Sequence, residues 1–150
     1  MTPEDITSIG KMSGAIMLGL SAIGSGLGAG AASLSAIGAW KKCYAQNKMA
    51  PFMIVAFVGA PLSQTIYGFI LMLRIIKSAE AGGNWPALLG AGIFGGLAMG
   101  ISAWMQGKAS AAASDALAET GQGAANYFMV IGIIETVALF VLAFIYQAIK

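Results

Sequence analysis

Four long stretches almost free of charge are the feature that most constrains the fold of this chain. Residues 12–40, 49–73 and 81–107 contain no Asp, Glu, Lys or Arg, and residues 120–149 contain only Glu135. Each stretch is long enough to cross a hydrocarbon core of about 30 Å, which takes roughly 20 helical residues. Because every backbone group in lipid needs an internal partner, such stretches must be helices. The sequence therefore predicts an all-α membrane protein with four transmembrane helices.

Composition agrees with this class of protein. Hydrophobic residues make up 58% of the sequence and charged residues 9%, whereas soluble domains contain about a quarter charged residues. The net charge of +2 is small and spread along the chain, which argues against a protein that binds nucleic acid. The chain has no His and a single Cys, Cys43, so it offers neither an internal disulfide nor a zinc site of the usual ligand spacing.

Charged and turn-forming residues mark where the helices are expected to end. The sequence predicts transmembrane helices over about residues 12–40, 51–77, 87–117 and 122–149, joined into two hairpins that occupy residues 1–79 and 80–150. Pro51 and Pro86 are expected in the first turns of the second and third helices, where a proline loses no hydrogen bond. The acidic start, MTPEDITSIGK, lacks the basic region of a signal peptide and is expected to be a short exposed segment.

The lysines predict an orientation. Lys41, Lys42 and Lys48 form the densest positive cluster in the chain. Because cytoplasmic loops of membrane proteins carry an excess of Lys and Arg, the loops at 41–50 and about 115–123 are expected in the cytoplasm. Both termini are then expected on the outer side.

The two halves of the sequence resemble one another. The segment QTIYGFIL, which starts at Gln64, aligns with ETVALFVL, which starts at Glu135. The helices before these segments align as well, with Ser25 matching Ser102. The pattern predicts a helical hairpin duplicated in tandem, a parallel repeat in contrast to the inverted repeats of many secondary transporters.

Glycines in the first helix predict close contacts between helices. The segment GLSAIGSGLGAGAAS places Gly24 four residues before Gly28, and Gly26 four residues before Gly30. On a helix these pairs form two small faces that allow backbones to approach closely, as on the inner wall of a ring. A glycine loop that cradles phosphate needs a preceding strand and an aqueous loop, which this uncharged stretch does not offer.

Several polar residues are expected at one depth in the middle of the membrane. With a helical rise of about 1.5 Å per residue, Glu135, Gln64 and Gln106 each fall some 16 Å from the cytoplasmic edge. Ser63 is adjacent to Gln64, and Tyr67 lies one turn further along the same side. The simplest alternative is that such Gln and Ser side chains only tie helices together.

Pro61 is expected to modify the helix beside these residues. It removes a backbone donor and is expected to loosen the turn around Ala60, whose carbonyl can then point sideways. The cluster then offers about five oxygens, a plausible shell for a hard cation. An unpaired charge at mid-membrane costs about 2.5–3.5 kcal/mol, so Glu135 is expected to pair with a cation or to be protonated. A monovalent cation makes the site neutral, which favours Na⁺, with H⁺ as the second possibility.

These motifs together resemble a known family. The segments IGSGLGAG, PLSQTIYGF, MQGKASAA and IIETVALF are similar to those of the four-helix proteolipid, the c-type rotor subunit or subunit K, of V-type and A-type rotary ATPases. The resemblance covers the whole chain. It implies a ring of identical subunits in the cell membrane of a prokaryote, which turns in lipid against a stator subunit with an essential arginine. Central-stalk subunits are expected to meet the loop from Lys41 to Lys48. The chain is then an ion-carrying subunit and no enzyme on its own.

The resemblance also implies ligands. In Na⁺-transporting members they come from segments that correspond here to the Ala60 carbonyl, Ser63, Gln64, Gln106 and Glu135, with Tyr67 holding the carboxylate. Ser63 stands where a threonine is expected. Because Gln64 replaces a second carboxylate, each chain of four helices is expected to carry one ion site.

Two other functions compete with that of a rotor. A small four-helix cation or drug antiporter also uses one intramembrane Glu, but that residue is expected in the first helix, which here is uncharged and rich in glycine. A purely structural four-helix membrane protein predicts that Glu135→Gln has no effect and that the chain forms no large ring.

Overall fold

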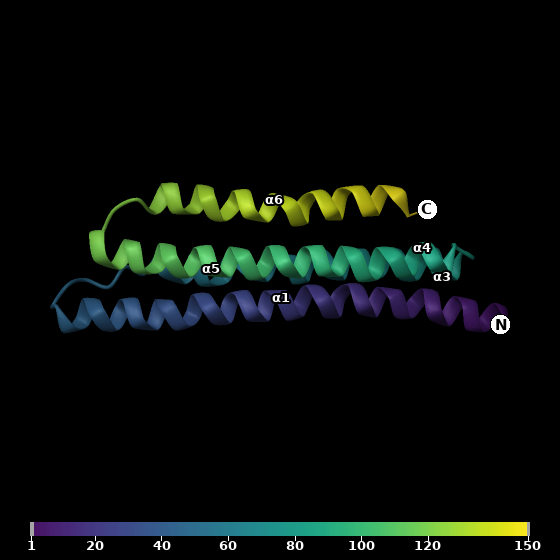
Figure 1. The fold of residues 1–150 in the computed structure, drawn as a ribbon, viewed down its shortest axis with the longest axis horizontal. Coiled ribbons are helices and arrows are strands. Elements are labelled where there is room, and N and C mark those ends of the chain that lie inside the picture. The colour runs from purple at the N-terminus through teal and green to yellow at the C-terminus, as the bar shows by residue number, and fades with distance from the viewer. Residues whose placement is uncertain (1, 150) are drawn as a thin grey trace.

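The computed structural model describes residues 2–149, which form helices joined by short loops (Figure 1). Met1 and Lys150, the outer ends of the two predicted hairpins, lie outside this range. The elements are α1 (Pro3–Ala45), α2 (Ile54–Gly59), the 3₁₀ turn η1 (Ala60–Leu62), α3 (Ser63–Glu80), α4 (Trp85–Gly90), the π-helical turn η2 (Ala91–Gly95), α5 (Gly96–Thr120) and α6 (Ala124–Ala148). Residues 2–149 contain no β-strand.

The short elements continue one another, so the chain makes four passes. Four helical stretches are long and apolar enough to cross a membrane: Pro3–Ala45, Ile54–Glu80, Trp85–Thr120 and Ala124–Ala148. The predicted all-α fold with four spans is therefore confirmed. The tandem duplication of its two hairpins stays a prediction.

The starts of some helices differ from the predicted ones, because local contacts determine where a helix begins. Helix α1 begins at Pro3, so the segment expected to be exposed chain is helical. The reason is a capping box, in which the Asp5 backbone N–H donates to Thr2 Oγ1 and the Thr2 N–H donates to Asp5 Oδ2. Pro86 lies in the first turn of α4 as predicted. Pro51 does not lie in a first turn, because α2 starts only at Ile54.

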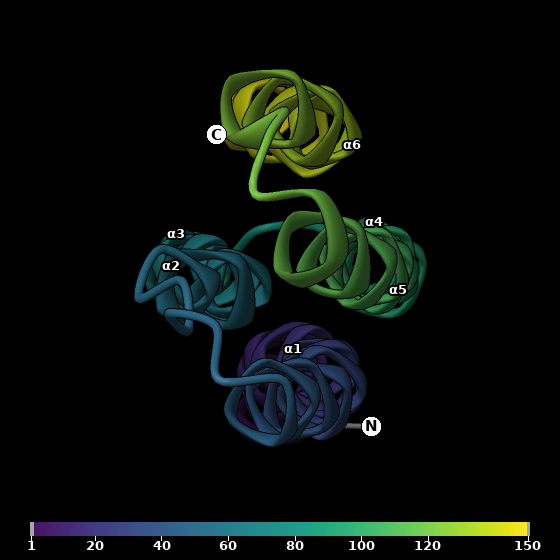
Figure 2. The same ribbon diagram turned by 90° about the vertical axis from the view of Figure 1, so that its left-hand side faces the viewer.

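The helices form a bundle in which α1 and α6 lie on opposite sides (Figure 2). Between them lie α3 and α5, and α1 packs along both. Helix α6 packs on α5 and α3 and lies furthest from α1 (Figure 2). Many large apolar side chains of α6 are exposed, including Ile133, Phe140 and Phe144, as expected of a helix that faces lipid.

Glycine brings α1 and α5 into backbone contact. A Cβ atom at Gly24 would overlap the backbone of Gly100, and one at Gly107 would overlap the backbone of Gly28. By contrast, a Cβ atom at Gly26 or Gly30 would have no atom within 4 Å. Of the two small faces predicted on α1, one is therefore used inside the chain and the other is left open.

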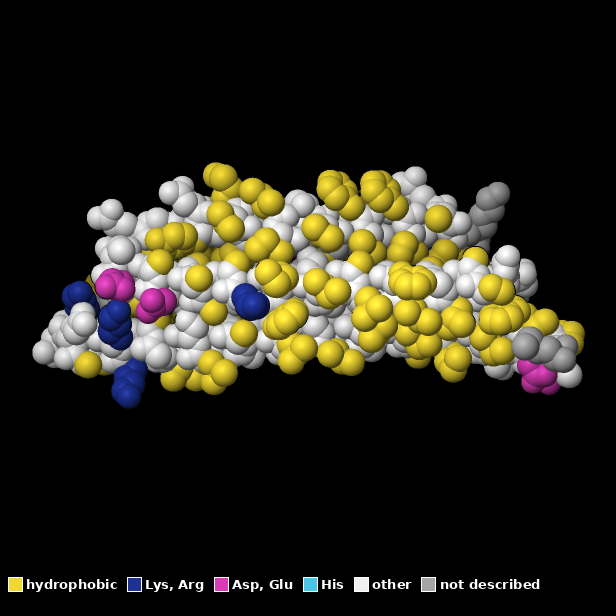
Figure 3. Space-filling view, viewed as in Figure 1, with side chains coloured by type: hydrophobic (Ala, Val, Ile, Leu, Met, Phe, Trp, Pro, Cys, Tyr) yellow, Lys and Arg dark blue, Asp and Glu magenta, His cyan; other side chains and the backbone are white. Residues whose placement is uncertain are grey.

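Most of the charged side chains on the face in Figure 3 lie at the ends of the bundle, hydrophobic side chains cover most of its middle, and one Lys or Arg lies further in. Lys42 Nζ lies 3.1 Å from Glu119 Oε2 at the end where the loops after α1 and α5 lie. Lys11 Nζ lies 2.8 Å from Glu80 Oε1 at the end that holds both termini. The two loops predicted to be cytoplasmic thus share one end of the bundle, opposite the termini (Figure 1).

Candidate ion site

A change of helix type beside Pro61 shapes the first part of the site. Helix α2 ends at Gly59, and Ala60–Leu62 form a 3₁₀ turn before α3 begins. The Ala60 carbonyl accepts the backbone N–H of Ser63 and also the Ser63 hydroxyl, whose Oγ lies 3.1 Å away. We expected a loosened turn here. Instead the missing N–H of proline is accommodated by a tighter turn, which turns the Ala60 carbonyl toward Ser63.

Ser63 connects this turn to Gln64. The Ser63 hydroxyl lies within hydrogen-bonding distance of Gln64 Oε1, at 3.2 Å, as well as of the Ala60 carbonyl. Three oxygen atoms from five consecutive residues, the Ala60 carbonyl, Ser63 Oγ and Gln64 Oε1, therefore lie beside one another. They come from a single turn of chain, so their spacing depends on local geometry rather than on helix packing.

Two buried glutamines join α3 to α5. The Gln64 amide Nε2 donates to Gln106 Oε1 at 2.7 Å, and both side chains are fully buried. Gln106 Nε2 in turn donates to Glu135 Oε2 at 3.1 Å and to the Ile131 carbonyl at 3.2 Å. Gln106 thus connects all three helices of the site and uses both hydrogens of its amide group.

Glu135 is held from two sides. The Tyr67 hydroxyl donates to Glu135 Oε1 at 2.6 Å, while Gln106 donates to Oε2. The carboxylate is half-buried at the junction of α3, α5 and α6. Among the described residues, the ion pairs of Lys and Arg involve Glu80 and Glu119, and none involves Glu135. Within residues 2–149, its carboxyl oxygens are therefore held by hydrogen bonds and by no cationic side chain.

All six residues predicted for the site lie in one hydrogen-bonded chain. It runs from the Ala60 carbonyl through Ser63, Gln64 and Gln106 to Glu135, and ends at Tyr67. The sequence predicts Gln64, Gln106 and Glu135 at one depth, and the structure joins them by hydrogen bonds across three helices. The members of this chain offer oxygen atoms, the ligand type that hard cations prefer.

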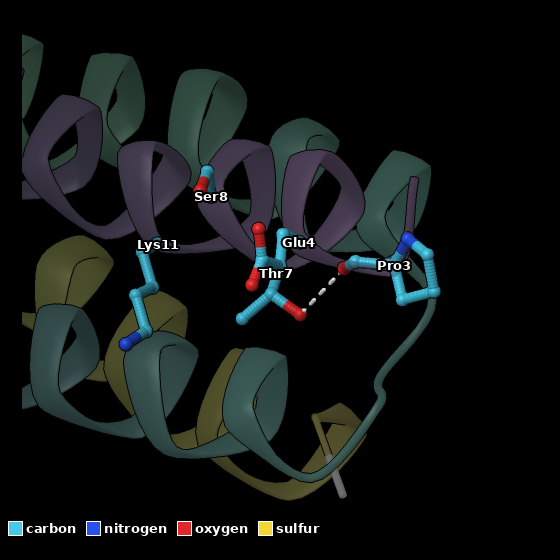
Figure 4. A pocket seen from close by; sticks show the side chains of 5 residues that line it. All are labelled: Pro3, Glu4, Thr7, Ser8 and Lys11. Atoms are coloured by element: carbon cyan, nitrogen blue, oxygen red, sulfur yellow. Dashed lines mark hydrogen bonds between the residues drawn. The ribbon is translucent and has the colours of Figure 1, made fainter. Parts of the chain in front are cut away.

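A surface hollow of about 410 Å³ lies apart from this site (Figure 4). The hollow is at the start of α1 and is lined by Pro3, Glu4, Thr7, Ser8 and Lys11. Its lining comes from one face of a single helix, and Thr7 Oγ1 donates to the Pro3 carbonyl at 3.0 Å (Figure 4). It shares no residue with the polar chain around Glu135.

Two comparisons with known proteins show what the chain is similar to. Residues 89–146 match the family model of the ATP synthase C-subunit. This segment contains Gln106 and Glu135. The A-type ATP synthase subunit K of Methanocaldococcus jannaschii is 33% identical over 134 residues. Residues 89–146 are thus similar to the ATP synthase C-subunit, and most of the chain is similar to an A-type subunit K.

The similarity to subunit K covers 88% of this chain but 57% of the archaeal relative. The chain therefore spans little more than half of the length of that protein. The all-α fold predicted from the sequence is consistent with this similarity.

Two supporting contacts beside Glu135 were not predicted from the sequence. The Ile131 carbonyl accepts from Gln106, and the Ser102 hydroxyl donates to the Ile134 carbonyl at 2.9 Å. Both contacts hold α6 against α5 next to Glu135. Helical spacing could have pointed to both residues. Ile131 is four residues before Glu135 and Ser102 is four residues before Gln106, so each lies on the same helix face as a site residue.

Proposed function

We propose that this chain is the rotor-ring subunit of an A-type ATP synthase or a related V-type ATPase, which binds Na⁺ at Glu135 and carries it across the membrane. The proposal is supported by the similarity to the ATP synthase C-subunit and to an A-type subunit K, and by one observation above all. Within residues 2–149, the only carboxylate in the apolar part of the bundle lies among neutral oxygen donors, held by Tyr67 and Gln106.

Sodium fits the chemistry of the site. The candidate ligands are Glu135, Ser63 Oγ, Gln64 Oε1, Gln106 Oε1 and the Ala60 carbonyl. One carboxylate with a monovalent cation gives a neutral site, which can cross an apolar medium at far lower cost than a charged one. Tyr67 occupies Oε1 of the carboxylate, so Oε2 is the oxygen nearest to the glutamines. The same carboxylate carries H⁺ in the alternative form of this proposal.

A ring of identical subunits is supported by the surface of the chain. The open face at Gly26 and Gly30 allows a neighbouring helix to approach α1 as closely as α5 does on the other face. Helix α6 exposes apolar side chains to lipid or to a stator subunit. Each chain then contributes one ion site per four helices, because Gln64 stands at the position that matches Glu135 in the other hairpin.

In the proposed cycle, Na⁺ reaches Glu135 from one half-channel at the stator and leaves through the other when a stator arginine displaces it. The central stalk is proposed to contact the loop from Lys41 to Lys48, at the cytoplasmic end. This chain binds and carries the ion, whereas ATP is made or hydrolysed by other subunits. Fewer ions for each turn allow a steeper gradient, which favours pumping.

Carbodiimide labelling of the purified ring tests this proposal. Glu135 is expected to be the modified residue, and millimolar NaCl, but not KCl, is expected to slow its modification across a range of pH. Labelling that depends on pH but ignores Na⁺ supports the proton-carrying rotor instead. No labelling of Glu135 under any condition contradicts an ion-carrying role.

A further inference from the structure

Ser25 on α1 has a buried hydroxyl group without a protein partner. Its side chain is 2% exposed, and its Oγ, like that of Ser110 on α5, forms no hydrogen bond with any described residue. Three other buried serines, Ser13, Ser21 and Ser114, each donate to the backbone carbonyl four residues earlier. A buried hydroxyl without a partner is costly, so the different behaviour of Ser25 needs a physical reason.

The register of α1 against α3 places Ser25 opposite Gln64. A Cβ atom at Gly68 would contact the Ser21 side chain, and one at Gly28 would contact Pro61. The two helices are antiparallel neighbours (Figure 2). Ser25 is one turn from both Ser21 and Gly28, just as Gln64 is one turn from both Gly68 and Pro61. Ser25 and Gln64 therefore face one another between these two contacts.

One of the two amide hydrogens of Gln64 forms no hydrogen bond with a described residue. Its Nε2 donates one hydrogen bond, to Gln106 Oε1, although a primary amide carries two hydrogens. Gln106, by comparison, donates both, to Ile131 and to Glu135. A buried donor hydrogen on α3 and a buried acceptor on α1 thus lie in facing positions, and neither has another partner among the described residues.

We propose that Ser25 is a positioning residue of the ion site, whose hydroxyl accepts the second amide N–H of Gln64 through one water molecule. This contact fixes the amide from the side away from Glu135. The Gln64 oxygen then stays turned toward Ser63 and the Ala60 carbonyl, where a cation is proposed to bind. Without it, rotation of the amide by half a turn would present N–H to the cation.

The contact gives α1 a role in ion binding that it otherwise lacks, since the six residues of the polar chain come from other helices. The inference rests on the proposed function in that Glu135 is the ion-carrying group. It concerns the geometry of Gln64, however, and so applies to a site for Na⁺ or for H⁺.

The test compares Ser25→Ala with Ser13→Ala in the assembled ring. Both variants remove a buried hydroxyl from α1, but that of Ser13 donates to its own helix at Ile9. Two quantities are measured: the NaCl concentration that halves carbodiimide labelling of Glu135, and the pH midpoint of labelling in Na⁺-free choline buffer. Ser25→Ala is expected to raise the NaCl concentration about fivefold and to shift the midpoint, as loss of one buried hydrogen bond implies. Ser13→Ala is expected to change neither.

A double-mutant cycle with Gln64→Ala tests whether Ser25 acts on the site through Gln64. Once Gln64 is removed, Ser25→Ala is expected to have no further effect. Full additivity of the two changes, or a Ser25→Ala ring equal to Ser13→Ala in both quantities, overturns the inference. If Na⁺ fails to protect the unmodified ring while Ser25→Ala still shifts the pH midpoint, sodium transport is refuted and the positioning role of Ser25 stands.

Discussion

Tyr67 on α3 donates a 2.6 Å hydrogen bond to Glu135 on α6 and so links the hairpin that lacks a mid-membrane carboxylate to the hairpin that has one. The bond directs one carboxylate oxygen toward α3, while Gln106 holds the other. Since α6 lies at the edge of the bundle, this contact fixes the position of its only charged group. The ion site thus depends on both halves of the chain.

Replacement of Tyr67 by Phe removes this donor and leaves the ring in place. Glu135 is then free to turn away from the glutamines, so we expect affinity for Na⁺ to fall by roughly tenfold, as for loss of a hydrogen bond to a charged group. The measurement is the NaCl concentration that halves carbodiimide labelling of Glu135. Tyr127→Phe, which alters a tyrosine packed on Phe57, is the matched control. An unchanged NaCl requirement in Tyr67→Phe would show that the bond is not needed for binding.

Glu135→Gln separates ion transport from assembly. Glutamine has nearly the same size, and its single amide oxygen can still accept the hydrogen bond from Tyr67 or the one from Gln106, so we expect rings of normal size in detergent. It carries no charge and no titratable proton, so ATP-driven ²²Na⁺ uptake by the reconstituted complex is expected to fall below detection. Uptake near the normal rate would argue for a purely structural role of this residue.

The position of the site could be predicted from the sequence because helices rise evenly. Gln64, Gln106 and Glu135 were placed at one depth by counting along uncharged stretches, and they lie in one hydrogen-bonded chain. The four spans followed from the same stretches. That these residues are ligands stays a prediction, since hydrogen bonds among them also suit the tying of helices.

Features that depend on a few local bonds could not be predicted in this way. The start of α1 at Pro3 depends on the reciprocal bonds of Thr2 and Asp5, which outweigh the polar character of the segment. The 3₁₀ turn at Ala60 depends on how the chain accommodates Pro61. Which atom of Gln106 faces Glu135 depends on the rotation of a buried amide, which no pattern of residue types encodes.

Arg74 is expected to stabilise the end of α6. Its Nε and Nη2 atoms donate to the Ile149 carbonyl at 3.0 and 2.6 Å, and its guanidinium carbon lies 4.9 Å from the centre of the Tyr146 ring. A cation at a helix C-terminus interacts favourably with the last carbonyls, and two parallel donors hold the group in place. We expect Arg74→Gln to speed amide hydrogen exchange in the last turn of α6 by roughly tenfold.

Arg74→Lys is expected to recover only part of this protection, because an ammonium group does not reproduce two donors in a fixed plane. Lys77→Gln removes the same charge one turn away on α3 and serves as the control. Equal exchange rates in Arg74→Gln and Lys77→Gln would mean that overall charge, and not the contact with Ile149, stabilises this end.

Substitutions at two glycines of α1, Gly24 and Gly26, test folding of the subunit and assembly of the ring separately. A methyl group at Gly24 would overlap the backbone of Gly100, so Gly24→Ala is expected to push α1 and α5 apart and to cost about 1–3 kcal/mol of stability. Gly26→Ala meets no atom within 4 Å, so the isolated subunit is expected to keep its thermal stability in detergent. If the open face packs on a neighbouring copy, Gly26→Ala instead lowers the yield of SDS-resistant rings. Normal ring formation by Gly26→Ala and by the bulkier Gly26→Leu would place the contact between copies on another face of α1.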